Sequence, residues 1–255
     1  MTDGARAVAS GFVVHAYSEV GSTNDVAREL LRLGAPARVV VHARAQTKGR
    51  GRDGRSWISA PGDLYLSIGL RPRGRPGDVA LLGFAAAVAV AETVDVFAGA
   101  AGPARIKWPN DVLLAGRKIA GILLESDGAR PDGVDALVVG VGINVGGDPA
   151  GTRIPATSLR LAGANAGVDE VLEAFLACFD RHHRAWEDEG FAPVRTAWLA
   201  RAHGLGDPVV ARLPGATLEG RFAGLGPDGA LLLDQGGGAV RHIHAGDVFF
   251  PASAC

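Results

Sequence analysis

The stretch QTKGRGRDGRSW, residues 46–57, concentrates positive charge between two apolar segments. From Arg44 to Arg55 there are five basic residues and one acid, a local charge of +4, whereas the whole 255-residue chain has a net charge of −1. Guanidinium groups bind phosphate and carboxylate oxygens in a bidentate manner, and interleaved glycines let backbone N–H groups approach the same anion. The stretch therefore predicts a binding loop for a discrete anion.

Three simpler interpretations of this loop compete with that one. A solvated basic loop explains the charge but not three Gly-Arg pairs within seven residues. Gly49, Gly51 and Gly54 match the dinucleotide pattern G-x-G-x-x-G, but that pattern should open a helix, and Pro61 followed by Gly62 prevents one here. The phosphate-loop pattern G-x-x-x-x-G-K-S/T does not occur in the chain. What remains from these interpretations is a phosphate group bound by arginine side chains.

The segments around the loop predict a domain of mixed helices and strands. Ser22 and Thr23 offer N-cap hydroxyls to a first helix, and apolar periodicity predicts helices at 24–33, 78–98, 168–189 and 190–202. Apolar β-branched runs predict strands at 38–44, 64–71, 112–114, 118–125 and 137–145. Since the two types do not alternate strictly, the fold class is α+β.

The composition changes after His203. Short β-type runs separated by Gly, Pro and Asp occupy residues 207–251 and predict a small barrel or sandwich. We therefore divide the chain into a large domain at 1–204 and a small β domain at 205–255.

Composition also limits the class of protein. The near-neutral charge argues against a general nucleic-acid binder. The two cysteines, Cys178 and Cys255, cannot form a disulfide framework and indicate a reducing compartment. The longest apolar run, 79–91, is too short to span a bilayer, and the N-terminal residues make a poor signal peptide. These features predict a cytoplasmic protein.

Two segments outside the loop carry charged candidates. In KWPND, residues 107–111, Asp111 suits Mg²⁺ beside a polyphosphate, but the segment taken alone favours a simple Asn-Asp turn before a strand. Lys118 opens the strand 118–125, either as a strand-edge charge or as a cation at an anionic reaction centre. Glu125 at the far end of that strand is predicted to be a surface or turn partner.

Taken in order, these segments resemble the motifs of the biotin protein ligases. The matching stretches are STN (22–24), QT (46–47), GRGRDGRSW (49–57), KWPND (107–111), KIAGILLE (118–125), GVGIN (140–144) and ATSL (156–159). The C-terminal β segment is similar to the small SH3-like domain of that family. The resemblance therefore implies a mixed-sheet catalytic domain followed by an SH3-like β-barrel.

The resemblance implies a two-step reaction. Biotin and Mg-ATP give biotinyl-5′-adenylate and pyrophosphate, and the adenylate then acylates a specific lysine of a biotin carboxyl carrier domain. Because the biotin carboxylate and the α-phosphate repel each other, fixed cations and Mg²⁺ must neutralise both. The implied partner is the carrier domain, with a homodimer as an option; neither DNA nor a membrane is expected.

The resemblance also assigns residues to each substrate. For biotin it implies Ser22, Thr23, Asn24, Gln46, Gly49, Arg50, Gly51, Arg52, Lys118, Gly121, Leu123 and Gly140. For ATP it implies Arg52, Arg55, Trp57, Lys107, Asn110, Asp111, Lys118 and Asn144. The implied catalytic residues are Lys118, Arg52 and Asp111, with Asp111 as the Mg²⁺ ligand. In this assignment Gly121 and Gly140 leave room for the bicyclic ring, Leu123 forms an apolar wall, and Trp57 stacks near adenine.

Two features depart from the family pattern. Some members carry an N-terminal winged-helix domain and act as repressors, but here only about twenty residues precede the STN motif, too few for a domain. We therefore expect the short form without a repressor role. Asp53 places an acid in the basic loop, and we expect it to pair with Arg50, Arg55 or Lys48 and hold the loop in its unliganded shape.

Three other functions remain as alternatives. A lipoate or octanoate ligase or transferase shares the fold but does not need the Gly-Arg-Gly-Arg motif. A non-catalytic biotin or nucleotide sensor would not need Arg52, Lys118 and Asp111. A nucleic-acid binder with an OB-like C-terminal platform would need more aromatic residues than Phe222, Phe249 and Phe250.

Overall fold

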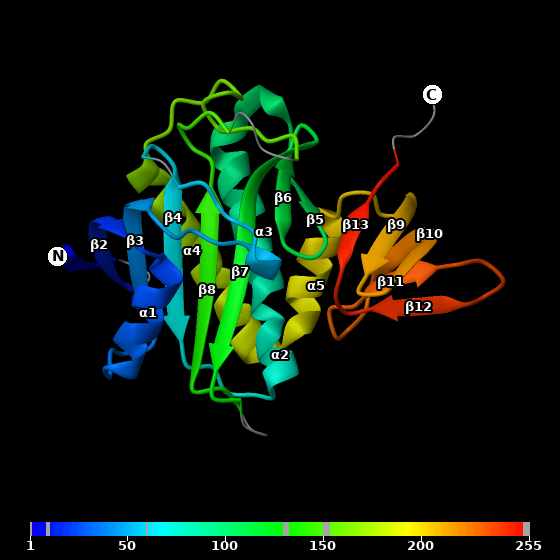
Figure 1. The fold of residues 1–255 in the computed structure, drawn as a ribbon, viewed down its shortest axis with the longest axis horizontal. Coiled ribbons are helices and arrows are strands. Elements are labelled where there is room, and N and C mark those ends of the chain that lie inside the picture. The colour runs from blue at the N-terminus through cyan, green and yellow to red at the C-terminus, as the bar shows by residue number, and fades with distance from the viewer. Residues whose placement is uncertain (1, 9–10, 60, 130–132, 150–153, 252–255) are drawn as a thin grey trace.

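The computed structural model describes residues 2–8, 11–59, 61–129, 133–149 and 154–251. Figure 1 shows a large unit, a sheet with helices on both faces, and a smaller β unit toward the C-terminus. Helices and strands do not alternate as in a parallel α/β fold, which confirms the predicted α+β class.

The large unit is built on an eight-stranded sheet with the order β1-β2-β3-β4-β8-β7-β6-β5. Its strands are β1 (Thr2–Ala7), β2 (Val13–Val20), β3 (Val39–Gln46), β4 (Leu64–Leu70), β5 (Arg105–Lys107), β6 (Asp111–Leu114), β7 (Arg117–Asp127) and β8 (Ala136–Ile143). Strands β2 and β3 run parallel, whereas β3, β4, β8 and β7 pair antiparallel in succession. The central strands are almost wholly buried because both faces of the sheet are covered.

The helices cover the two faces unequally (Figure 1). On one face, α1 (Thr23–Arg32) packs Ala27 and Leu31 against apolar side chains of β3 and β8. The absence of a side chain at Gly69 of β4 lets α1 approach the sheet closely: a Cβ there would lie 3.1 Å from the Leu31 side chain. The other face carries α3 (Leu82–Ala98), α4 (Val168–Glu189) and α5 (Phe191–Ala200). The single helix α1 leaves part of its face open, and the candidate site lies there.

The helical segment Pro76–Ala101 is longer than the apolar run seen in the sequence. It comprises α2 (Pro76–Ala80), α3 and the 3-10 turn η2 (Gly99–Ala101). By length and composition alone this segment could cross a membrane, contrary to the prediction from residues 79–91. However, 67% of its most apolar 18-residue stretch is buried inside the protein. Such burial is typical of a core helix.

The smaller unit is a five-stranded antiparallel sheet with the order β12-β11-β10-β9-β13. Its strands are β9 (Pro208–Leu213), β10 (Ala216–Leu225), β11 (Leu231–Asp234), β12 (Val240–Ile243) and β13 (Asp247–Phe249). It packs on the large unit through Trp198, whose ring lies 6.3 Å from that of Phe222, and through Trp108, which donates from Nε1 to the Gly229 carbonyl at 3.1 Å. The five-stranded sheet confirms the predicted small β module, and the two contacts join it to α5 and to the residue that follows β5.

Most predicted elements are present, with three groups of differences. Strands β1, β2 and β5 were not predicted, and the predicted helix 78–98 is interrupted at Leu81. Ser22 occupies the N-cap of α1 but makes no side-chain capping hydrogen bond. Cys178 is a free thiol, whereas Cys255 lies outside the described residues.

Candidate active site

The floor of the candidate site lies on β4, β8 and β7 and contains Gly121, Gly140 and Gly142, which we call the glycine patch. Strand register places Ser67, Gly140 and Leu123 in one row across these strands. In a neighbouring row, Gly142 of β8 faces Gly121 of β7. Because alternate residues of a strand share a face, these residues lie together on the face of the sheet that carries the start of α1.

The first residues of α1 are buried and bonded to this floor. Ser22, Thr23 and Asn24 are only 3–4% exposed. Thr23 donates from its backbone N–H (2.8 Å) and its hydroxyl (3.1 Å) to Gln46 Oε1, and its Oγ1 lies 2.7 Å from Ser67 Oγ. The predicted capping hydroxyl of Thr23 is thus used to join α1 to β3 and β4.

The Asn24 amide is held from both ends. Ser67 Oγ donates to Asn24 Oδ1 at 2.5 Å, and Asn24 Nδ2 donates to Glu125 Oε2 at 2.7 Å. A Cβ on Gly140 would lie 2.3 Å from Asn24 Oδ1. The space over Gly140 is therefore occupied by the Asn24 amide.

The two ends of the arginine–glycine loop, residues 49–55, are tied together. Gln46 Nε2 donates to Ser59 Oγ at 2.9 Å, and the Trp57 N–H donates to the Gly49 carbonyl at 3.0 Å. A Cβ on Gly49 would lie 2.5 Å from the Trp57 carbonyl oxygen, so this close approach requires glycine. The loop therefore emerges beside Gln46 and the start of α1.

Arg50 faces carboxylates in this structure. Its Nε and Nη2 donate to the two Glu125 oxygens at 3.0 and 2.9 Å, and its Nη1 and Nη2 donate to Asp25 at 2.9 and 2.6 Å. These bonds raise the pKa of the Arg50 guanidinium, which is charged in any case. The side chain thus joins the loop to α1 and β7.

Arg52 and Arg55 link the loop to its other neighbours. Arg52 donates from Nη1 to Asn110 Oδ1 at 3.1 Å and from Nη2 to the Gly246 carbonyl at 3.2 Å. Arg55 forms an ion pair with Asp247, the first residue of β13. The smaller unit therefore contacts the loop through the residues that precede and begin β13.

Asp53 adopts a left-handed backbone conformation, with φ 55° and ψ 33°, in the turn η1 (Arg52–Gly54). Its carboxylate lies 3.4 Å from Arg55 Nη2, so the expected pairing occurs with Arg55. The Gly51 N–H donates to the Arg55 carbonyl at 2.7 Å and closes the same turn. Both side chains of the Asp53–Arg55 pair are more than half exposed, which makes the interaction weak.

The Trp57 ring lies on the glycine patch. A Cβ would come within 2.9 Å of the ring at Gly121 and within 2.7 Å at Gly142. Lys118 Nζ lies 5.3 Å from the centre of one Trp57 ring, within cation–π range. The Trp57 Nε1 atom is buried, and no described residue accepts its hydrogen bond. Part of the space expected for the bicyclic ring is thus taken by the indole.

Cations and one carboxylate gather where β5, β6 and β7 meet. Lys118 forms an ion pair with Asp111, and their side chains are 20% and 16% exposed. Burial lowers the pKa of the Lys107 ammonium, although the carboxylates of Asp111 and Asp247 oppose the shift. Asn110 donates from Nδ2 to the Ile122 carbonyl at 2.7 Å, which turns its Oδ1 toward the loop.

Asn144 is placed differently from the other predicted residues. It is 8% exposed, and its Nδ2 donates to the Thr157 carbonyl at 2.8 Å. It therefore holds the 156–159 segment against the end of β8.

The described part of the chain holds no group of three or more His, Cys, Asp or Glu side chains suited to a metal ion. Asp111 is thus a single carboxylate that would need phosphate oxygens to complete a Mg²⁺ site.

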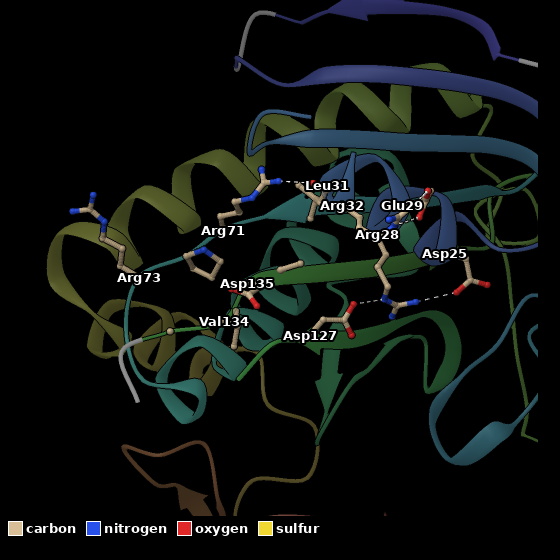
Figure 2. Close-up of a pocket in the computed structure, with 13 residues that line it drawn as sticks. Asp25, Arg28, Glu29, Leu31, Arg32, Arg71, Arg73, Asp127, Val134 and Asp135 are labelled. Carbon is tan, nitrogen blue, oxygen red and sulfur yellow. Dashed lines mark hydrogen bonds and ion pairs between the residues drawn. The ribbon is translucent and has the colours of Figure 1, made fainter. Parts of the chain in front are cut away.

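Two cavities lie in the protein, and neither is lined by Gly121, Gly140 or Gly142. One of about 350 Å³ lies between the two units and is lined by Arg52, Asn110 and Leu123 among others. The other, of about 880 Å³, lies beside α1 and includes Arg28 and Arg73 (Figure 2). None of the predicted site residues lines this second cavity, so its size alone does not mark it as the active site.

Comparison with known proteins identifies the two units. Residues 17–144 match the family model described as biotin/lipoate A/B protein ligase family, and residues 204–250 match the biotin protein ligase C terminal domain. The chain belongs to the biotin protein ligase family. The match supports the SH3-like assignment of the smaller unit.

Individual members of the biotin protein ligase family resemble the chain over most of its length. A biotin–[acetyl-CoA-carboxylase] ligase of Paracoccus denitrificans is 40% identical over 236 residues, which cover 89% of this chain and 98% of that protein. The bifunctional ligase/repressor BirA of Bacillus subtilis is 35% identical over 91% of this chain and 72% of its own length. The biotin protein ligase of Aquifex aeolicus in complex with biotin and ATP, 26% identical, superposes with a TM-score of 0.77 over 93% of this chain and 99% of that chain.

The family motifs did not reveal every residue that shapes this site. Ser59 and Ser67 are buried partners of Gln46 and Asn24, yet nothing in their immediate sequence marks them. The prediction that Glu125 is a surface or turn partner is wrong. Its side chain is only 25% exposed, and its carboxylate accepts hydrogen bonds from Asn24 and Arg50. Strand alternation could have found it, since it lies on the same face as Gly121 and Leu123.

Proposed function

We propose that this chain is an ATP-dependent ligase that joins biotin to a lysine of a biotin carboxyl carrier domain. In the first step a biotin carboxylate oxygen bonds to the α-phosphorus of ATP and pyrophosphate leaves. In the second step the lysine amine bonds to the acyl carbon and AMP leaves. The observation that carries the proposal is the convergence of the arginine–glycine loop, Lys118 and the start of α1 around one patch of glycines.

The biotin half of the site is the space bounded by Thr23, Asn24 and Gln46. Their hydroxyl and amide groups suit the ureido group of biotin, which both donates and accepts hydrogen bonds. The valerate chain would extend over Gly121 and along Leu123 toward Lys118. For this, the Trp57 ring must leave Gly121, which fits a loop that closes again over the bound ligand.

The ATP half of the site is the cluster of Arg52, Arg55, Lys107 and Asn110 near Asp111. The three cations would neutralise the triphosphate, and Lys118 would stabilise the charge that develops between the carboxylate and the α-phosphate. We propose Mg²⁺ as the required metal: when bound, it would polarise phosphate oxygens and be held by Asp111 together with the triphosphate. The single carboxylate fits this mode of binding.

Further parts of the proposal rest on the sequence. Two cysteines without a disulfide framework favour the cytoplasm. The near-neutral charge favours a protein partner over DNA, and the family relationship makes a biotin-dependent carboxylase the source of the carrier domain. A homodimer is compatible with these features. The named relatives above are biotin ligases, so the lipoate alternative is not favoured.

The test is the intact mass of a purified carrier domain before and after incubation with this chain, biotin and Mg-ATP. We expect a gain of one biotinyl group, and none when the acceptor lysine is replaced by arginine. Parallel reactions with lipoate, without ATP and with EDTA separate the alternatives. A folded chain that transfers lipoate but not biotin, or that modifies nothing, would refute the proposal.

A further inference from the structure

Glu125 is where three separate segments of the candidate site meet. Its carboxylate accepts hydrogen bonds from Asn24 of α1 (2.7 Å), from Arg50 of the loop (2.9 and 3.0 Å) and from Arg28 of α1 (3.1 Å). Burial would raise the pKa of this carboxyl, but the bonds from Arg50 and Asn24 outweigh it and hold the pKa below the usual range. The group is therefore a permanent anion at neutral pH.

A carboxylate decides which way the Asn24 amide points. An amide has a donor end and an acceptor end, and it can turn over by rotation of its side chain. The Ser67 hydroxyl can donate or accept, so it would satisfy either orientation, whereas an ionised carboxylate can only accept. Among the groups that bond the Asn24 side chain, Glu125 alone requires Nδ2 on its side and thus directs Oδ1 toward Ser67 and Gly140.

The loop shares this carboxylate with α1. Arg28 lies between Asp25 and Asp127 (Figure 2) and also donates to Glu125, so it remains in place when the loop moves. Arg50 belongs to the loop and bonds Asp25 and Glu125 only while the loop lies against α1. Removal of Arg50 would leave Glu125 with one cation in place of two.

We infer that Glu125 is a positioning residue that orients the Asn24 amide toward biotin and, through Arg50, couples this orientation to closure of the arginine–glycine loop. The inference rests on the proposed function, because it takes Asn24 as a biotin contact. Coupling of this kind is reciprocal: once the Trp57 ring has left Gly121, a loop held by Arg50 strengthens biotin binding, and bound biotin protects the loop to the same extent.

The experiment compares Glu125→Gln, Arg50→Ala, their double variant and Asp127→Asn. Glutamine keeps the size of Glu125 but presents either a donor or an acceptor, so it no longer selects one amide orientation. Asp127 is the matched control because it lies on the same strand, pairs with Arg28 and is half exposed. Biotin affinity by calorimetry and the rate of tryptic cleavage in residues 50–55, with and without biotin, are measured on chains of verified thermal stability.

We expect Glu125→Gln to weaken biotin binding on the order of tenfold or more, as for loss of a charge-assisted hydrogen bond. Arg50→Ala should weaken it less, and the double variant should bind about as well as Glu125→Gln alone. Biotin should slow cleavage of the loop in wild type and in Asp127→Asn, but not in Glu125→Gln.

Three outcomes would overturn the inference. Wild-type affinity in Glu125→Gln would remove the orienting role, and fully multiplicative losses in the double variant would show that Arg50 does not act through Glu125. An equal loss of biotin affinity in Asp127→Asn would mean that Glu125 acts through general stability and not through the orientation of the Asn24 amide. A wild-type chain that binds no biotin would instead refute the proposed function, which distinguishes the two failures.

Discussion

Gly140→Ala separates two explanations for the glycine at this position. If Gly140 leaves room for biotin, the methyl group harms only ligand binding. If it leaves room for Asn24, the methyl group also harms the free protein, because the new Cβ would lie 2.3 Å from Asn24 Oδ1. Gly140 lies within β8 and does not have a positive φ, so alanine is compatible with the backbone there.

The magnitude follows from the bonds that the methyl group displaces. Asn24 must turn away, which breaks its bonds to Ser67 (2.5 Å) and Glu125 (2.7 Å). Asn24 is only 3% exposed, and an unsatisfied buried polar group costs about 1–3 kcal/mol, whereas Ser67 keeps its contact with Thr23 Oγ1 at 2.7 Å. For a protein of this size that loss lowers the melting temperature by roughly 2–4 °C per kcal/mol. Biotin affinity should fall on the order of tenfold or more, since the donor and acceptor of Asn24 are both displaced.

Thermal or urea unfolding of the ligand-free protein, together with calorimetry for biotin, provides the assay. Gly77→Ala is the control: a Cβ there meets nothing within 4 Å, and the residue is the second of the short helix α2, so alanine should not lower the stability. If Gly140→Ala unfolds like wild type in the absence of biotin, the reasoning about Asn24 is refuted, whatever happens to the affinity.

Four further predictions concern the loop and its cations. Lys118→Ala should reduce pyrophosphate release much more than biotin affinity, because charge at the transition state depends more on this ammonium than the ground state does; equal losses would make Lys118 a binding residue only. Arg52→Ala should let the adenylate escape, measured as biotin on bystander lysines, and unchanged retention would exclude that role. Asp53→Ala should change the affinity for ATP, because it frees Arg55 from one carboxylate; identical isotherms for ATP and biotin would show that Asp53 does not hold the unliganded loop. The folded-state pKa of Glu125 is lowered, so its stabilising effect is present above the unfolded value of about 4.3 and is lost as pH falls through the folded pKa; the difference in unfolding free energy between wild type and Glu125→Gln should therefore shrink on acidification, and a pH-independent difference would contradict the assignment.

The sequence predicted the strands β3, β4, β6, β7 and β8 because their apolar runs are continuous, and two of them, β4 and β8, are almost wholly buried. It did not predict β1, β2 or β5, whose residues are mixed in polarity or very few in number. Strands β1 and β5 are the two edges of the sheet and β2 lies next to an edge. Such strands depend on pairing with a neighbour, and local composition carries little information about that pairing.

The site could be predicted to a similar extent. The loop arginines share one short segment, so their spacing alone keeps them together, whereas Lys118 lies on β7 and comes near the loop only through the fold, 5.3 Å from the Trp57 ring. The partners that orient them come from distant strands. Glu125 and Asp247 are ordinary acids in the sequence, and each acquires a role only from the arginine beside it in the fold.

The sequence by itself determined the chemistry that this protein can offer: cations interleaved with glycine for anions, a hydroxyl–amide triplet at a helix start, and two units of different composition. Only the tertiary structure decided which of these groups are free and which are already bonded. Hydrogen bonds and ion pairs between residues more than 70 positions apart, such as Arg50 with Glu125 and Asn24 with Glu125, depend on strand order and register. The hydrophobic pattern and the turns help to set the register of strands that already pair, but packing of the whole sheet decides which distant strands become neighbours.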